Sequence, residues 1–483
     1  MSSTGQNKNV THSRRSFIRL VAGSSALVTT ATGASSAQSS TERVNWKFTI
    51  EDEWRIRTAP TIVNGIVYFG YGGGTVYAVD AATGEEVWRY ETSGSVRSTP
   101  QVVGGTVYVG SSDNNLYALD ANSGDEVWTF STGETSNRTG VVSSPTVSNG
   151  TVFVGNRFER GTGPDTGVYA IDATTGTEEW SYETLATVEA SPLVVDGTVI
   201  VGGQDDPVYA LDEKTGEEIW SYATSGGVSS PTYSQNRVFV GSRDGTIHPL
   251  EISSGEQAWT FTSDSESGFV GSKVAPTVKD GSVFVGMTDG SLYSIKETDG
   301  TQNWKYTATN DSFYSSPTIA GGAIFIRGDG EALYVINSDG SEKWTFNIPG
   351  ERPKSALRSP SSPTVVNGDV YFGGGNTLFS LSSNSGKSSG GSRVNYGVLG
   401  HHNVWAIKAS EDDNQPPQDS PEVPSELDGE ITTEQYTAVL DGDDELNAGS
   451  LSSAVNQWAT TGAVNGVNIG AGELSALVNY WAA

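Results

Sequence analysis

Short apolar runs separated by glycine-containing turns recur along most of the chain. In the first clear copy, an apolar run from Val76 leads through a turn at Gly84 into a second run that carries Trp88. The pattern returns at Leu116–Trp128, Val168–Trp180, Val208–Trp220, Ile247–Trp259, Leu292–Trp304 and Leu333–Trp344. A further copy begins at Leu378 and has no Trp. Self-similarity at a period of about forty residues predicts a repeat architecture.

A second pair of runs precedes each copy and opens with a proline. These prolines are Pro60, Pro100, Pro145, Pro192, Pro231, Pro276, Pro317 and Pro363. Turns such as Asn64-Gly65 and Asp196-Gly197 join the two runs and indicate hairpins, because both turn positions need positive φ. The unit is therefore four antiparallel strands, A to D. Such small sheets bury their faces when they stand in a ring, which predicts a β-propeller.

The blade count follows from a mismatch between the two parts of the repeat. Eight units open with proline, but only seven Trp-bearing D strands follow them. The run from Arg43 to Phe48 has the pattern of a D strand, carries Trp46 and precedes the first proline. We therefore predict an all-β fold, an eight-bladed β-propeller of four-stranded antiparallel blades over residues 43–408. The N-terminal strand should close the last blade.

The run with Asp80, Gly84 and Trp88 resembles the tryptophan-docking repeat of the PQQ-like propellers. That family includes the quinoprotein alcohol and glucose dehydrogenases and the outer-membrane assembly lipoprotein BamB. The resemblance implies that each indole packs between neighbouring blades as a structural residue. The indoles concerned are Trp46, Trp88, Trp128, Trp180, Trp220, Trp259, Trp304 and Trp344.

The composition is strongly acidic. The 483 residues include 57 Asp and Glu against 28 Lys and Arg, for a net charge of −29. This balance argues against nucleic acid or anionic lipid as the main partner. Together with the propeller pattern it is typical of adaptation to high salt, and the chain resembles haloarchaeal proteins. There is no Cys, which excludes a disulfide, a thiolate metal site or a Cys-linked lipid anchor.

Residues 1–37 have the features of a targeting segment. Arg14 and Arg15 lie in a run, Ser13 to Arg19, that matches the twin-arginine consensus. The weakly apolar stretch that follows is too short and too polar to span a bilayer well. We expect export by the twin-arginine pathway and a secreted or cell-surface protein.

Two segments follow the propeller. Residues 409–430 are acidic and rich in Pro, which indicates an extended linker. Residues 431–483 contain a duplicated loop-helix unit with one apolar face on each helix. These faces consist of Leu451, Val455 and Trp458, and of Leu474, Val478 and Trp481. We therefore predict a small α-helical C-terminal module.

The module resembles a degenerate dockerin, the calcium-binding pair of loops that docks secreted proteins onto cohesins. Asp441 and Asp443 fall on two calcium-ligand positions of the first loop, while the second loop lacks most of its acids. The sequence leaves two interpretations open. One is a Ca²⁺ site at these two aspartates with a cohesin-like partner, and the other is a calcium-independent helical pair.

Evidence for catalysis is weak. In the quinoprotein dehydrogenases, a vicinal disulfide and a Trp sandwich PQQ, a Ca²⁺ held by Glu and Asn polarises it, and an Asp acts as base. This chain has no Cys and shows no such constellation, so PQQ is not expected as a cofactor. The four histidines, His12, His248, His401 and His402, form no legible nucleophile–His–acid arrangement.

One face of the propeller is the better candidate for binding. B-to-C turns and D-to-A connections share a face, which carries the longer loops and most of the arginines. The residues three before each opening proline should line its central mouth. They are Arg57, Arg97, Val142, Glu189, Val228, Lys273, Tyr314 and Pro360, of which Arg57, Arg97, Glu189, Lys273 and Tyr314 are the predicted partner-binding residues.

The arginines on this face have two possible uses. They could bind an acidic protein or a polysaccharide. Alternatively, they could pair locally with the loop aspartates Asp113, Asp205, Asp206, Asp244 and Asp289. The sequence as a whole predicts an exported, non-catalytic binding or scaffold protein at the cell surface. The alternative is an enzyme, a quinoprotein dehydrogenase or a carbohydrate-active protein delivered by the dockerin-like module.

Overall fold

The computed structural model describes residues 43–52, 54–133, 140–157, 166–204, 207–264, 274–309, 311–329, 332–348, 361–383, 463–464 and 467–468. The predicted targeting segment, the linker and nearly all of the C-terminal module lie outside these residues. Within the described ranges, no helix has the length and hydropathy that a membrane span requires.

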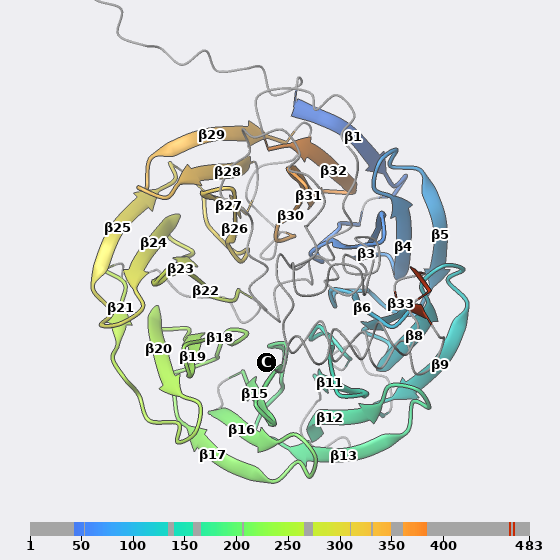
Figure 1. Cartoon of the computed structure of the whole chain (residues 1–483), viewed down its shortest axis with the longest axis horizontal. Helices are drawn as coiled ribbons and strands as arrows, with labels where there is room; N and C mark the ends of the chain where they lie inside the picture. Colours follow the sequence, from blue (N-terminus) through green and yellow to red (C-terminus); the bar gives the residue numbers. More distant parts are fainter. Residues whose placement is uncertain are drawn as a thin grey trace, which may run out of the picture. The chain divides into compact units, whose positions relative to one another are not determined.

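Thirty-two strands form eight four-stranded antiparallel sheets, arranged as blades around a ring (Figure 1). Blade 1 is β2 (Thr61–Val63), β3 (Ile66–Tyr71), β4 (Thr75–Asp80) and β5 (Glu86–Glu91); blade 2 is β6 (Gln101–Val103), β7 (Thr106–Gly110), β8 (Asn115–Asp120) and β9 (Glu126–Ser131). Blade 3 is β10 (Thr146–Ser148), β11 (Thr151–Gly155), β12 (Thr166–Asp172) and β13 (Glu178–Glu183); blade 4 is β14 (Leu193–Val195), β15 (Thr198–Gly202), β16 (Val208–Asp212) and β17 (Glu218–Tyr222).

Blade 5 is β18 (Thr232–Ser234), β19 (Arg237–Gly241), β20 (Thr246–Glu251) and β21 (Phe261–Thr262); blade 6 is β22 (Thr277–Lys279), β23 (Ser282–Gly286), β24 (Ser291–Lys296) and β25 (Gln302–Thr307). Blade 7 is β26 (Thr318–Ala320), β27 (Ala323–Arg327), β28 (Ala332–Asn337) and β29 (Glu342–Asn347). Blade 8 is β30 (Thr364–Val366), β31 (Asp369–Gly374), β32 (Thr377–Ser382) and the N-terminal β1 (Val44–Thr49). A separate two-stranded hairpin consists of β33 (Ala463–Val464) and β34 (Val467–Asn468).

The ring is closed in blade 8, where the first strand pairs with the last strand of the propeller. β1 runs antiparallel to β32, with Trp46 opposite Ser380 and Phe48 opposite Leu378. The predictions of eight blades and of closure by the N-terminal strand are therefore confirmed. The predicted A-to-B turns are confirmed as well, because Asn64 and Gly65 both have positive φ, of 50° and 78°.

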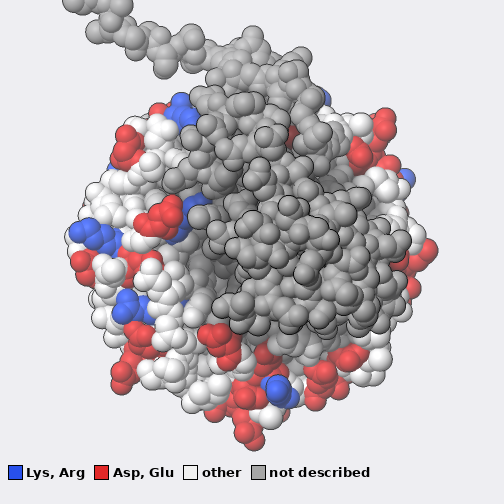
Figure 2. Space-filling view, viewed as in Figure 1, with Lys and Arg blue, Asp and Glu red and all other residues white. Residues whose placement is uncertain are grey.

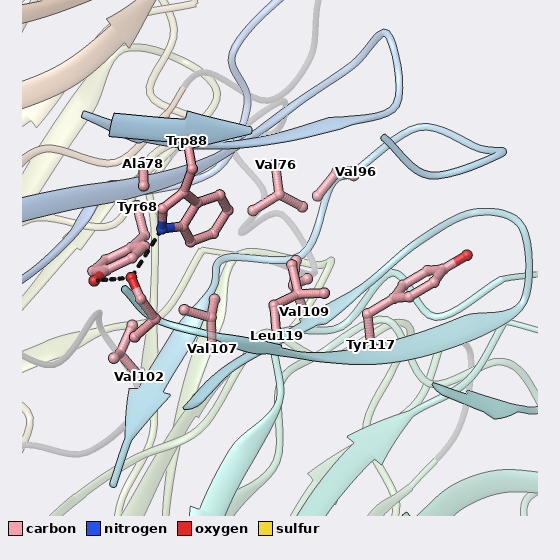
Figure 3. Close-up of a cluster of buried hydrophobic side chains, with 11 residues drawn as sticks. Tyr68, Val76, Ala78, Trp88, Val96, Val102, Val107, Val109, Tyr117 and Leu119 are labelled. Carbon is pink, nitrogen blue, oxygen red and sulfur yellow. Dashed lines mark hydrogen bonds between the residues drawn. The ribbon is translucent and has the colours of Figure 1, made fainter. Parts of the chain in front are cut away.

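Indoles fill the gaps between blades. Trp88 of blade 1 is buried, and its Nε1–H donates to the Ala121 carbonyl of blade 2 at 2.9 Å (Figure 3). Gly124 lies beneath the ring, since a Cβ there would stand 2.7 Å from the indole. The same bond joins Trp46 to Ala81, Trp128 to Ala173, Trp180 to Glu213, Trp220 to Ile252, Trp259 to Glu297 and Trp304 to Ser338. Trp344 differs, because its Nε1 has no acceptor among the described residues and Arg43 lies 4.4 Å from its ring centroid.

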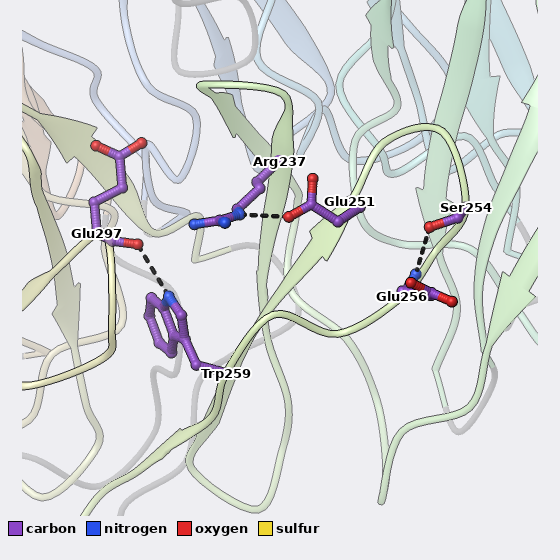
Figure 4. Close-up of polar contacts among 6 residues, drawn as sticks. All are labelled: Arg237, Glu251, Ser254, Glu256, Trp259 and Glu297. Atoms are coloured by element: carbon purple, nitrogen blue, oxygen red, sulfur yellow. Dashed lines mark hydrogen bonds and ion pairs between the residues drawn. The ribbon is translucent and has the colours of Figure 1, made fainter.

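Blade 5 departs from the repeat because a proline sits inside its third strand. Pro249 in β20 has no N–H, and β21 pairs with β20 only at Thr246 and Ile247. Trp259, expected within the fourth strand, therefore lies before β21. Its indole still donates to the Glu297 carbonyl at 3.0 Å (Figure 4).

Two sets of hydroxyl bonds join the blades near the ring axis. The residue after the opening proline is often Thr, which donates to the next blade's proline carbonyl, as Thr61 does to Pro100 at 2.6 Å. Thr364 donates to Pro60 at 2.7 Å and so bridges blades 8 and 1. The residue before the proline donates its N–H to a hydroxyl in the next blade, as Ser144 does to Ser191 at 2.9 Å.

Candidate binding face

The predicted mouth lies on the face formed by the B-to-C turns and the D-to-A connections. Main-chain bonds fix this arrangement: in blade 1 the turn residue Gly72 donates to the Arg55 carbonyl at 3.0 Å, and Ile56 bridges to Tyr71. We call this the loop face. On the opposite face, the C-to-D turn bonds to the A-to-B turn, as Ala81 N–H does to the Gly65 carbonyl at 2.8 Å.

The predicted mouth residues fall into distinct environments. Arg57, Arg97 and Tyr314 are half-buried. Glu189 is also half-buried, and Arg157 forms an ion pair with it, with 3.6 Å between Nε and Oε1. Lys273 and Pro360 lie outside the described residues.

The expected mouth position Val228 is wrong, because this side chain is fully buried between blades 4 and 5. Val142 keeps the predicted spacing from its proline and is 4% exposed. Val228 bridges to Ser242 in the way that Val96 bridges to Ser111. Val96 lies four residues before its proline and Val228 only three, so blade 5 lacks one residue in this connection and has no mouth residue of the predicted kind.

The three described turn carboxylates, Asp113, Asp244 and Asp289, do not pair with arginines as the local alternative required. Asp113 accepts bonds from the Ser93 N–H at 2.9 Å, the Asn115 N–H at 3.0 Å and the Tyr117 hydroxyl at 2.9 Å. Asp244 and Asp289 likewise accept the N–H groups of Thr246 and Ser291. For these three aspartates the predicted ion pairs are wrong, because the carboxylates close their own turns. Asp205 and Asp206 lie outside the described residues.

Blade 5 holds a Ser–His–Asp cluster that the sequence did not reveal. His248 replaces the Tyr found at this C-strand position in blades 1 to 4, and it is buried. Gln257 Nε2 lies 2.8 Å from His248 Nδ1, and Ser242 Oγ lies 3.1 Å from Nε2. Ser242 also bonds to Asp244. Burial lowers the pKa of His248, and the nearby Asp244 charge partly offsets that effect.

The burial of Ser242, and the bond direction that follows if the Gln257 amide donates, both argue against a nucleophilic serine. If the Gln257 amide donates to Nδ1, the proton of neutral His248 is on Nε2 and is donated to Ser242 Oγ. Ser242 then donates to Asp244. A catalytic histidine must instead accept the serine proton. Ser242 is also fully buried, so we assign the cluster a structural role.

The chain has no Cys, and in the described ranges no group of three or more His, Asp or Glu side chains could hold a metal ion. The predicted metal ligands, Asp441 and Asp443, lie outside those ranges.

Comparison with known proteins gives a family match and structural likenesses. A family model described as outer membrane protein assembly factor BamB matches residues 31–190, 138–231, 164–279, 208–312 and 267–464. The crystal structure of BamB from Moraxella catarrhalis has a TM-score of 0.58 at 18% identity, over 70% of this chain and 99% of that chain. The computationally designed Ika8 protein has a TM-score of 0.57 at 18% identity, with the same coverage. No curated protein matches the chain. At this identity the two structures support the fold alone.

Proposed function

Because the chain belongs to the family described as outer membrane protein assembly factor BamB, we propose that it is a non-catalytic propeller that binds a protein partner through its loop face. The observation that carries this proposal is a contrast between polar side chains that stabilise the blades and a large side chain that the loop face leaves exposed. His248, Ser242 and the turn aspartates hold the blades in shape, whereas the loop face presents Trp54 with 54% exposure. Exposed Trp and Arg side chains are the residues that contribute most to protein interfaces.

We further propose that the protein works outside the cytoplasm. The motif at Arg14 and Arg15 supports export by the twin-arginine pathway. The acidic composition supports a surface adapted to high salt. Changing both arginines to lysine should leave the protein in the cytoplasm of its producer, and continued secretion of that variant would refute the assignment.

The C-terminal module would serve as a second docking element. Its likeness to a dockerin supports a cohesin-like partner, with Asp441 and Asp443 as candidate Ca²⁺ ligands. Calorimetric titration of the full chain with Ca²⁺ should release heat that is lost when both are changed to Asn. If the two proteins give the same heat, these aspartates are not the ligands.

The binding proposal is tested with the full-length protein immobilised on a resin. Incubation with the producer's culture medium should capture a defined protein, which is then purified and titrated against the propeller. The enzymatic alternative is tested in parallel by adding PQQ and Ca²⁺ in a dye-linked alcohol or sugar oxidation assay. Turnover that depends on PQQ would overturn the non-catalytic assignment, as would failure to capture any partner from medium, membranes or surface extracts.

A further inference from the structure

Two connecting segments meet on the loop face around the B-to-C turn of blade 1. Gly72 in this turn donates its N–H to the Arg55 carbonyl at 3.0 Å, and its own carbonyl accepts the Ser95 hydroxyl at 2.6 Å. Further along, the Ala59 N–H donates to Thr99 Oγ1 at 3.2 Å. The two segments therefore run side by side, which makes Arg57 and Arg97 neighbours at equivalent positions of blades 1 and 2.

Three guanidinium groups gather at this place. Burial lowers the pKa of Arg57, and the neighbouring charges of Arg97 and Arg55 lower it further. All three side chains are half-buried. Within the described ranges, Arg57 has neither a hydrogen bond nor an ion pair. Its charge is partly desolvated among like charges, an arrangement that an added carboxylate would stabilise.

Blade 1 lacks the carboxylate that other blades place in this turn. Gly73 stands where blades 2, 5 and 6 have Asp113, Asp244 and Asp289. Asp52 approaches from the neighbouring segment, since its Oδ2 would lie 3.4 Å from a Cβ on Gly73. Among the described residues, these three arginines form a positive patch beside Asp52, on a protein whose net charge is −29.

An exposed indole adjoins this patch. Trp54 immediately precedes Arg55 and is the most exposed aromatic side chain in the described part of the chain, at 54%. Its Cβ lies 3.6 Å from where a Cβ on Gly72 would sit, so it belongs to the same turn. An indole beside guanidinium groups offers both apolar area and charge-assisted hydrogen bonds to one ligand.

We propose that Trp54, Arg55, Arg57 and Arg97 form a carboxylate-binding site for a short acidic peptide segment of a partner protein. This inference rests on the proposed binding function and names its site and its ligand class. A short segment fits better than a long polyanion, because the protein carries a net charge of −29 and Asp and Glu side chains gather along the described rim drawn in Figure 2. This negative charge repels an extended anion, whereas the patch attracts a few carboxylates.

The test uses the full-length protein and two labelled probes, a hexaglutamate peptide and a hexagalacturonate oligosaccharide. Binding is measured by fluorescence anisotropy at several salt concentrations. Arg57→Glu is compared with Arg89→Glu, a charge reversal of equal size at a side chain that is 56% exposed on the outer strand β5. Trp54→Ala and the milder Arg57→Gln are measured with them, and the melting temperature of each variant shows whether it is folded.

The proposal predicts that the peptide binds the unchanged protein and the Arg89→Glu variant equally. Binding to Arg57→Glu should be weaker by at least about tenfold, with smaller losses for Arg57→Gln and Trp54→Ala. Affinity should fall as salt is added. Absence of peptide binding, equal binding to folded Arg57→Glu, or tighter binding of the galacturonate would overturn the proposal.

Failure of this inference is distinguishable from failure of the proposed function. A protein captured from the medium that binds Arg57→Glu as tightly as the unchanged chain would overturn this site and leave the binding function intact. If that variant loses the captured protein while Arg89→Glu retains it, the site is supported for the natural partner as well.

Discussion

The contact between a glycine and an indole should decide whether each blade can dock on the next. Gly124 has a φ of 76°, and a Cβ there would stand 2.7 Å from the Trp88 ring. Gly105 has a φ of 81°, and nothing lies within 4 Å of its Cβ position. Replacing either residue by Ala costs about 1 kcal/mol for the left-handed backbone. Only Gly124→Ala also forces the indole to move.

The size of that second cost follows from what Trp88 loses. A displaced ring gives up its 2.9 Å bond to the Ala121 carbonyl, worth about 1 kcal/mol. Complete loss of the contacts of a buried aromatic side chain would cost about 3 to 5 kcal/mol. We therefore expect Gly124→Ala to lower the free energy of unfolding by about 1 to 4 kcal/mol more than Gly105→Ala does.

Urea unfolding followed by circular dichroism measures both variants, and unfolding rates replace free energies if unfolding is irreversible. Combining each glycine change with Trp88→Ala isolates the steric part. Without the indole, Gly124→Ala should cost no more than Gly105→Ala. If the two changes cost the same in the presence of Trp88, close docking of the indole on Gly124 is not what holds blades 1 and 2 together.

Three other predictions test further parts of the structure. Deleting β1 should lower the melting temperature sharply, because blade 8 would lose its outer strand; an unchanged melt would refute closure by this strand. Ser191 donates its N–H to Ser230 Oγ and Ala275 donates its N–H to Ser316 Oγ, but Ala275 has no hydroxyl to accept the Ser230 N–H. Changing Ala275 to Ser would supply this acceptor and should raise the free energy of unfolding by about 1 kcal/mol; no gain in a urea titration would contradict a stabilising role for these hydroxyl bonds between blades. Because burial lowers the pKa of His248 below its unfolded value of 6.5, the unfolded chain binds the proton first, and the free energy of unfolding should fall as the pH drops below about 6.5. His248→Tyr, the side chain that other blades carry, should remove that part of the pH dependence, and identical pH profiles would contradict it.

The repeat pattern predicted the blades well because each of its signals has a local cause. Asn-Gly turns require positive φ, and the continuous apolar runs of the second and third strands suit strands that are buried on both faces. Even the seam in blade 8 was predictable, since the proline-opened units outnumber the Trp-bearing strands that follow them. Pro249 also gave a signal in the sequence, because a proline cannot donate to a strand on either side.

The binding face could be predicted only in outline, because its details depend on neighbours that are distant in sequence. Counting back from the prolines placed Val228 at the mouth, and a one-residue deletion moved it into the core. The partner of Glu189 is Arg157 of the preceding blade, which no local pattern indicates. A comparison of the turns would have found the absence of an acid at Gly73, whereas the grouping of Arg57 with Arg97 required the positions of both connecting segments.

The seam of blade 8 sets the order in which the ring can be completed. The Asn45 and Ser380 side chains, hydrogen-bonded across it, are 335 positions apart. During synthesis the first strand can therefore pair in the propeller only after β32 has been made. A circular permutant that moves this strand behind β32 would make every blade local in sequence, and it should fold faster while keeping the same loop face.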